Sequence, residues 1–215
     1  MKKFSLILFF TLTATFLQAQ VNKTKTFLYA NAGLNLATFY QSTPKTEAEL
    51  AFRNIFVPEG GISIRAEYPT LIGFETGLNF SQKGTRLKSS DSLGDTRYKL
   101  NYVTAFFDGL YYFQLHGNNN NVYAGVGLYG GYAVNGKAIN DVTKTDIDFD
   151  GETWKKFDLG LQLKTGLSLN DKLTVGVNYD LAFLKTLTTK DLAGNENNCR
   201  NSILTVSLGI RLLKF

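Results

Sequence analysis

Residues 157–183 form the most regular pattern in the chain. Apolar side chains occupy nearly every second position, and glycine, amide and charged residues lie between them. A period of two is typical of a β-strand with one apolar and one polar face. Each of the two arms is longer than a usual strand of about 5–6 residues. The stretch therefore predicts a long β-hairpin.

The linker 170–172 sets the register of this hairpin. A three-residue loop places Leu169 opposite Leu173, whereas a two-residue loop would pair the apolar face of one arm with the polar face of the other. The polar face is rich in glycine and charge, which suits a crowded barrel interior. We therefore expect the apolar face to point toward lipid, through Leu159, Leu161, Leu163, Val175, Val177 and Leu181.

Alternating segments of this kind recur along the chain. The expected strands are 27–39, 60–68, 71–84, 98–113, 122–135, 157–169, 173–183 and 202–212. The pattern blurs around 106–109, which suggests a bulge. Long and short connections follow one another in turn, as in barrels with long outer loops and short periplasmic turns. The prediction is an all-β fold, an eight-stranded antiparallel up-and-down transmembrane β-barrel, with both termini on the periplasmic side. Aromatic residues near strand ends, such as Tyr29 and Trp154, suit interface girdles.

The N-terminus carries an export signal. Lys2 and Lys3 precede an apolar stretch of about a dozen residues, followed by small and polar residues around Ala19. The apolar stretch is shorter than the ~20 residues of a spanning helix, so a membrane anchor is the less favoured alternative. We expect a signal peptide at 1–19, a polar lead at 20–26 and the barrel at 27–215. This order predicts localisation in the cell outer membrane.

Composition excludes some classes of function. The chain of 215 residues suits one domain with a closed sheet. Its formal charge of +5 becomes +3 without Lys2 and Lys3, which is too mild to indicate nucleic-acid binding. The single cysteine, Cys199, cannot form an intramolecular disulfide. Outer-membrane lipid is the expected partner.

Several segments resemble the outer-membrane β-barrel domain family, small porin-like barrels of Gram-negative bacteria. The resemblance covers nearly all of the mature chain in the right order, and its most diagnostic pieces are Phe-Asp-x-Gly at 157–160 and Asn-Tyr at 101–102. The other pieces are GLNLATF (33–39), GISIRAEYP (61–69), FETGLNFSQKG (74–84), YAGVGLYGGY (123–132) and SILTVSLGIRL (202–212).

The chain departs from the family pattern at two places. Phe106 stands where members usually carry a proline, and Leu212 takes the phase of the usual closing aromatic residue. The terminal Phe215 still resembles the aromatic residue that the outer-membrane assembly machinery reads in the C-terminal strand. The family implies a membrane location and the barrel fold, and it implies little about a substrate.

Catalysis is not expected. An enzyme needs converging acid, base or nucleophile groups, and the only histidine, His116, lies in a short turn on the predicted periplasmic side. We expect no cofactor.

Ionisable residues recur on the predicted inner face. Lys164 lies opposite Asn178 and diagonal to Asp180, within reach of a long side chain. An eight-stranded barrel has room only for side chains or one small ligand, so we favour a compensated network that fills the lumen over a narrow polar pore or ligand pocket. The expected members are Arg65, Glu67, Glu75, Asp158, Lys164, Asp180 and Arg211.

A weak metal candidate consists of Asp146, Asp148 and Asp150, which precede Gly151 as in a calcium loop. However, the position of the closing glutamate holds Phe157. We favour an extension of the strand above the membrane, with these aspartates on the face of Asp158 as an acidic rim. No metal site is expected.

Three functional hypotheses remain. The leading one is a non-enzymatic outer-membrane barrel with a role in envelope structure or surface interaction through its long extracellular loops. The second is a narrow porin-like channel for small solutes or ions. The third is a secreted soluble lipocalin-like barrel with an apolar ligand, which requires the apolar face inside. The sequence names no extracellular ligand.

Overall fold

The computed structural model describes residues 24–41, 52–88, 94–115, 120–140, 142–149, 151, 153–170, 172–190 and 196–215. The expected signal peptide lies outside these residues, as does His116. The described part contains no helix long and apolar enough to cross a membrane.

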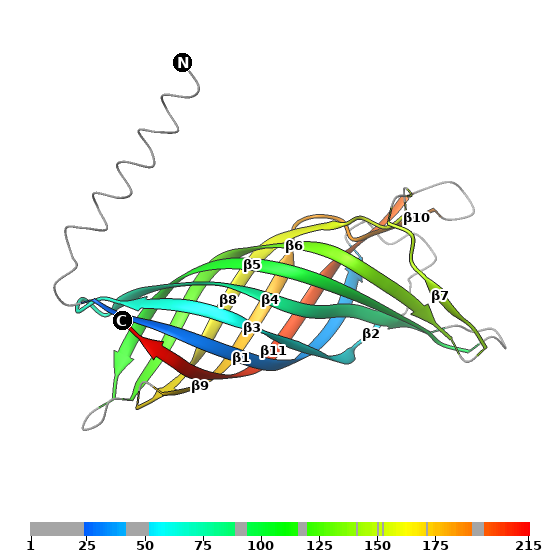
Figure 1. The fold of residues 1–215 in the computed structure, drawn as a ribbon. Helices are drawn as coiled ribbons and strands as arrows, with labels where there is room; N and C mark the ends of the chain where they lie inside the picture. Colours follow the sequence, from blue (N-terminus) through cyan, green and yellow to red (C-terminus); the bar gives the residue numbers. More distant parts are fainter. Residues whose placement is uncertain are drawn as a thin grey trace, which may run out of the picture.

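Eight long strands and three short ones make up one antiparallel sheet (Figure 1). The short strands are β2 (Phe52–Arg53), β7 (Lys144–Asp146) and β10 (Leu187–Lys190). The long strands are β1 (Lys25–Gln41), β3 (Ile55–Glu67), β4 (Ile72–Leu87), β5 (Thr96–Gln114), β6 (Asn121–Ile139), β8 (Phe157–Leu169), β9 (Leu173–Ala182) and β11 (Glu196–Lys214).

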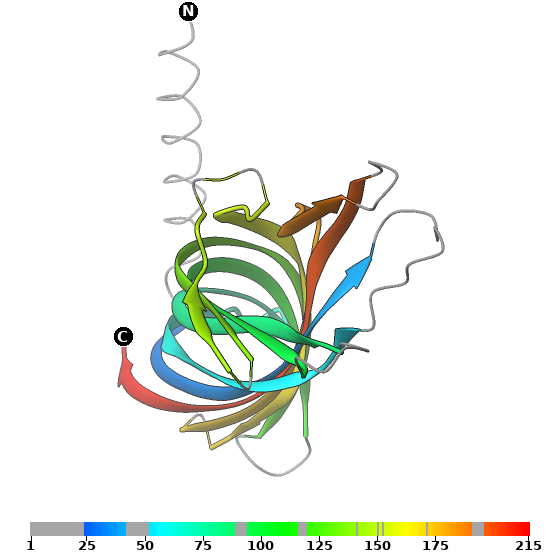
Figure 2. The ribbon, with the colours of Figure 1, turned by 90° about the vertical axis from the view of Figure 1, so that its right-hand side faces the viewer.

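The long strands close into a ring, seen end-on in Figure 2. Each pairs with its neighbours in chain order, and β11 pairs with β1 from Phe27–Lys214 to Gln41–Cys199. The backbone N–H of Phe215 donates to the oxygen of Thr26, so the two ends of the barrel chain meet. Closure removes the unpaired sheet edges that lipid cannot hydrate. The predicted eight-stranded antiparallel barrel is confirmed.

The hairpin of β8 and β9 has the register that the sequence predicts. Leu169 pairs with Leu173, and Lys164 pairs with Asn178. Asn170 has a φ of 50°, a left-handed conformation that asparagine tolerates better than most residues. The N–H of Lys172 donates to the oxygen of Leu169 at 2.9 Å and completes the turn.

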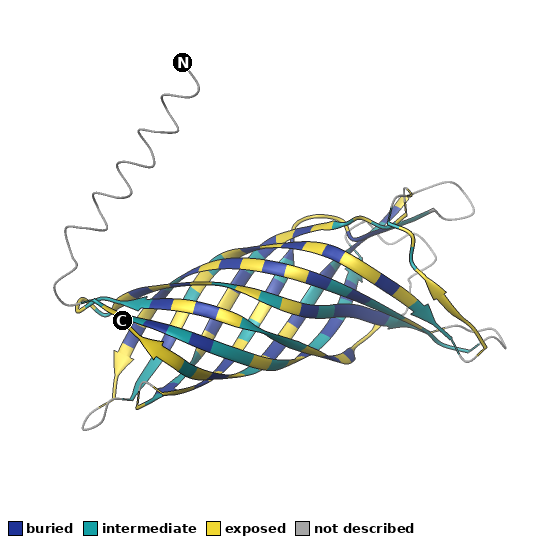
Figure 3. Ribbon diagram, in the orientation of Figure 1, coloured by how far each residue is buried: buried dark blue, intermediate teal, exposed yellow. Residues whose placement is uncertain are grey.

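Buried and exposed residues alternate along the strands (Figure 3). On this hairpin Leu159, Leu163 and Val177 are 40–47% exposed, whereas Asp158 and Lys164 are buried. The apolar face therefore points outward and the polar face lines the lumen, as expected. A soluble lipocalin-like barrel needs the opposite orientation, so that alternative is wrong.

We call the end of the barrel opposite the short turns the outer end. The strands extend further at this end than predicted. β3 begins at Ile55 and includes Pro58, and β11 begins at Glu196, so parts of two expected loops are sheet. Pro58 precedes Glu59, the first residue of β3 paired with β4, so its missing N–H interrupts no described bond to that strand. The bulge expected at 106–109 is absent there, since that register is continuous; the shift lies between Asn101 and Tyr102.

Candidate functional site in the barrel lumen

A central ionic cluster fills the middle of the lumen. Arg65 on β3 lies opposite Glu75 on β4, with Nη2 3.0 Å from Oε2. Lys164 on β8 reaches across the barrel to the same carboxylate at 3.2 Å and also pairs with Asp108 on β5. All four side chains are buried. Two cations facing two carboxylates compensate the charge, which buried ions require.

Aromatic rings hold the two cations from the sides. The Arg65 guanidinium lies 4.5 Å from the ring centroid of Tyr123 and 5.0 Å from that of Tyr29. The Lys164 ammonium lies 4.3 Å from the ring centroid of Phe106. Rings stabilise a cation through their negative faces, and here they also occupy the lumen around it. Tyr29 is thus an interior residue and not a member of an outer girdle.

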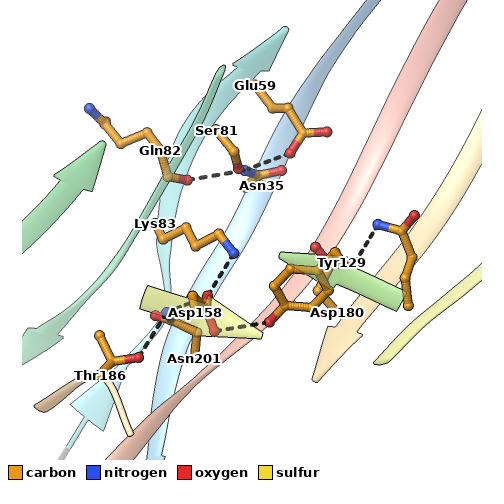
Figure 4. Close-up of polar contacts among 11 residues, drawn as sticks. Asn35, Glu59, Ser81, Gln82, Lys83, Tyr129, Asp158, Asp180, Thr186 and Asn201 are labelled. Atoms are coloured by element: carbon orange, nitrogen blue, oxygen red, sulfur yellow. Dashed lines mark hydrogen bonds and ion pairs between the residues drawn. The ribbon is translucent and has the colours of Figure 1, made fainter. Parts of the chain in front are cut away.

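An upper ionic cluster lies closer to the outer end (Figure 4). Lys83 on β4 and Asp158 on β8 form an ion pair with 2.8 Å between Nζ and Oδ2. Asn201 on β11 donates to the same oxygen at 2.9 Å and to the hydroxyl of Thr186 at 3.0 Å. Lys83 also lies 4.3 Å from the ring centroid of Tyr129. The cluster therefore ties β4, β8 and β11 together through the lumen.

Neutral side chains add further ties across the barrel. Asn35 on β1 donates to the hydroxyl of Ser81 and to the backbone oxygen of Gln82, each at 3.0 Å. It accepts a bond from Thr205 on β11 at 2.7 Å. β3 separates β1 from β4 in the sheet, so the bonds to β4 pass through the interior.

An outer apolar cluster adjoins the upper ionic cluster, with the ring centroid of Tyr102 5.1 Å from Lys83 Nζ. Trp154 contacts Phe39 with ring centroids 6.2 Å apart, and Tyr98 with centroids 5.2 Å apart. The cluster consists of buried Phe39, Leu100, Tyr102, Ala133, Leu187 and Cys199, with Phe52, Ile147, Phe149 and Trp154 packed against them. Trp154 therefore packs against buried residues of this cluster and is not part of an interface girdle.

One cavity in the described part of the chain lies at the central ionic cluster. A cavity of about 30 Å³ lies between Asn31, Arg65, Lys164 and Asn178. A buried water needs at least about 10–15 Å³, so this cavity holds on the order of two waters. A larger cavity of about 340 Å³ lies at the short-turn end, beside Tyr68.

The predicted network does not form a single cluster. Arg65, Glu75 and Lys164 meet in the central cluster, and Asp158 lies in the upper cluster. Asp180 accepts a bond from Gln162 at 2.7 Å, and Lys164 pairs with Glu75 and Asp108 instead of the expected Asp180. The remaining two residues lie near the short-turn end, half-buried: Glu67 and Arg211.

Sequence reasoning missed Lys83 and Asp108. Lys83 lies eight positions after Glu75 on the same strand, so the period of two already places it on the inner face. Asp108 was obscured because its inward neighbours, Phe106 and Leu110, are apolar and hide the alternation. The partners of these residues lie on distant strands, and no sequence signal indicates them.

The aspartates after β6 do not form the expected rim. Asp146 and Asp148 are exposed, while Ile147 and Phe149 pack into the outer apolar cluster, so the two aspartates do not share the inward face of Asp158. Asp150 lies outside the described residues. Within the described part of the chain, no group of three His, Cys, Asp or Glu side chains could hold a metal ion.

The closed ring, the apolar exterior and the polar interior define a transmembrane β-barrel. The outer membrane protein beta-barrel domain family matches residues 18–187. The chain belongs to this family and is an outer-membrane protein, as the resemblance implied.

Solved outer-membrane barrels are similar over most of the chain at low identity. The outer membrane protein OprG from Pseudomonas aeruginosa is 12% identical, with 89% of this chain and 95% of that chain covered and a TM-score of 0.47. The Ail protein of Yersinia pestis is 14% identical, with 90% and 99% covered and a TM-score of 0.40. The comparison with curated proteins found no match.

Proposed function

We propose that this chain is a non-conducting barrel that serves envelope structure or surface interaction, with its outer end as the contact surface. The observation that carries this proposal is the set of buried ion pairs that cross the lumen. Lys83 and Lys164 bridge strands that face one another across the barrel, and the outer apolar cluster lies above them. A permeating ion would have to break these buried pairs. Breaking a pair is costly because it leaves a buried charge without its partner.

Conductance in planar bilayers tests the proposal against the porin-like alternative. The refolded wild-type barrel is expected to show no discrete openings. Lys164→Ala removes a cation that spans the lumen, so a true lumen pathway would change its conductance in this variant. Reproducible wild-type openings whose size changes with Lys164→Ala would contradict the proposal and favour a channel.

We also infer that the chain is not an enzyme. The buried carboxylates of Glu75 and Asp158 are held in ion pairs, and that of Asp180 accepts a bond from Gln162. The cavity beside Glu75 and Lys164 has a volume of about 30 Å³, which leaves little room for a substrate next to these groups. A general acid or base must reach the proton it transfers.

The C-terminal strand is the proposed contact with the assembly machinery. Phe215 is 71% exposed at the end of β11, so its ring is accessible to a partner. This contact precedes membrane insertion and needs no open lumen.

A further inference from the structure

Four rows of outward-facing residues succeed one another toward the outer end of β4, β5 and β6. The first row is apolar: Phe80 pairs with Val103, and Val103 pairs with Tyr132. These three side chains are 44–52% exposed. The apolar exterior ends at this row on β4 and β5, and on β6 it ends at Val134, which lies in the register shift before the next row.

The second row consists of amides. Gln82 donates to Asn101 at 2.7 Å, and Asn101 donates to Asn135 at 2.6 Å. Each amide of this row thus has a hydrogen-bond partner within the row, which suits the boundary between hydrocarbon and polar surroundings.

The third and fourth rows are cationic. Lys99 on β5 lies directly opposite Lys137 on β6. In the next row Arg53 pairs with Arg86, and Arg86 with Arg97. β7 adds a sixth cation, Lys144, which pairs in register with Ile139 of β6. We call these residues the basic patch: Arg53, Arg86, Arg97, Lys99, Lys137 and Lys144. Figure 1 shows the ends of the strands that carry it at the right of the barrel.

The described part of the chain balances little of this charge. Arg86 lies 4.0 Å from Asp95, and Asp146 pairs in register with Lys137. Like charges directly opposite one another destabilise a sheet. Within the described residues this surface therefore carries a net positive charge, which suits an anionic partner.

The height of the patch indicates which anion lies beside it. Outward residues of β5 are apolar or small from Phe113 to Val103, which are ten residues apart. At about 3.4 Å per residue and a tilt of about 40°, this run spans about 26 Å along the membrane normal, close to the ~25 Å apolar band of such barrels. Lys99 and Arg97 then lie about 10 and 15 Å beyond Val103, at the level of the lipid headgroups.

We propose that the basic patch binds the phosphate groups of phosphorylated glycolipid in the outer leaflet of the outer membrane. The short turns, the start of β1 and the end of β11 lie at the other end of the barrel, which is the periplasmic end in this architecture, so the patch faces the outer leaflet. Lysine and arginine extend their apolar stems along the barrel and place their charged ends among headgroups. This binding does not depend on whether the lumen conducts.

The test uses the full barrel in non-ionic micelles, titrated with bisphosphorylated lipid A and followed by native mass spectrometry. The double variant Lys99→Glu, Lys137→Glu is expected to bind at least about tenfold more weakly, since each basic residue near an anionic surface contributes about a fivefold factor. The control Lys172→Glu, Lys185→Glu changes the net charge equally at exposed positions outside the patch and should bind like the wild type.

Two further probes separate the possible partners. Lipid A without its phosphates should bind the wild type no more tightly than bisphosphorylated lipid A binds the double variant. Lys99→Gln with Lys137→Gln, a milder change, provides the same comparison if the charge-reversed barrel does not fold. Equal binding of wild type and variant, equal binding of the phosphate-free lipid, or tighter binding of a soluble sulfated glycan than of lipid A would each overturn the proposal.

Discussion

At the scale of single residues, the charged side chains in the lumen are buried in pairs of opposite charge. The side chains of Lys83 and Asp158 are 1% and 0% exposed. Lys83 lies on β4 and Asp158 on β8, and Asn201 of β11 donates to the same carboxylate, so the ion pair and this hydrogen bond together join three strands. The net contribution of the ion pair to stability is small, because desolvation offsets attraction, but the loss of one partner is costly.

Replacement of Asp158 by alanine leaves the Lys83 ammonium buried without its carboxylate. We expect the free energy of unfolding to fall by about 3–5 kcal/mol, the usual cost of breaking a buried pair. Urea unfolding of the barrel in lipid vesicles measures it. The double variant Lys83→Met, Asp158→Leu replaces the pair with apolar groups and should recover most of the loss. A double variant as unstable as Asp158→Ala would contradict this account.

At the scale of the strand, glycine on the inner face makes room for the large rings of the lumen. A Cβ on Gly160 of β8 would lie 2.6 Å from the Tyr129 ring and 2.3 Å from the backbone oxygen of Leu181. Such contacts are shorter than real carbon atoms tolerate, so the absence of a side chain at Gly160 is a packing requirement. In contrast, a Cβ added to Gly130 of β6 would have no atom within 4 Å.

Alanine at these two glycines should therefore have different effects. We expect Gly160→Ala to destabilise the barrel by about 1–3 kcal/mol, the usual cost of overpacking. Gly130→Ala adds a methyl group to open space and should change stability by less than about 0.5 kcal/mol. Unfolding midpoints of both variants in the same vesicles provide the comparison. Equal losses would show that strand conformation, rather than contact with Tyr129, determines the effect.

At the scale of the whole molecule, β11 closes the ring on β1, and its C-terminal end is also the proposed contact with the assembly machinery. Ring closure depends on the full length of β11, which pairs with β1 through fifteen residue pairs. Phe215 follows the last of these pairs and adds one backbone bond, to Thr26. The two roles can therefore be separated.

Deletion of Phe215 is expected to leave folding in vitro nearly unchanged and to reduce assembly in cells several-fold. Heat-modifiable mobility in electrophoresis reports the folded barrel in both settings. Leu213→Ala is the matched control. Leu213 is exposed on the same strand, and this variant retains the terminal Phe215. Failure to refold in vitro would assign Phe215 to the barrel itself, and normal assembly in cells would contradict a recognition role.

Much of the architecture follows from the sequence alone. The period of two identified all eight long strands and the inner and outer faces, because alternation maps directly onto the two sides of a sheet. It also predicted the register of the hairpin, since only a three-residue loop keeps Leu169 opposite Leu173. Strand ends were less accurate: Pro58 and the polar residues from Glu196 suggested loops, although backbone pairing continues there.

Only the tertiary structure decided which interior groups meet. Lys164 was expected to reach Asp180 on the adjacent strand, yet its partners are Glu75 and Asp108 on strands across the lumen. Ring curvature brings these strands within side-chain reach, and alternation along a strand contains no information about it. The basic patch likewise depends on cross-strand register, which places Lys99 beside Lys137 although 38 positions separate them in the chain. The sequence therefore determined which face each residue occupies, and closure of the ring determined its partner.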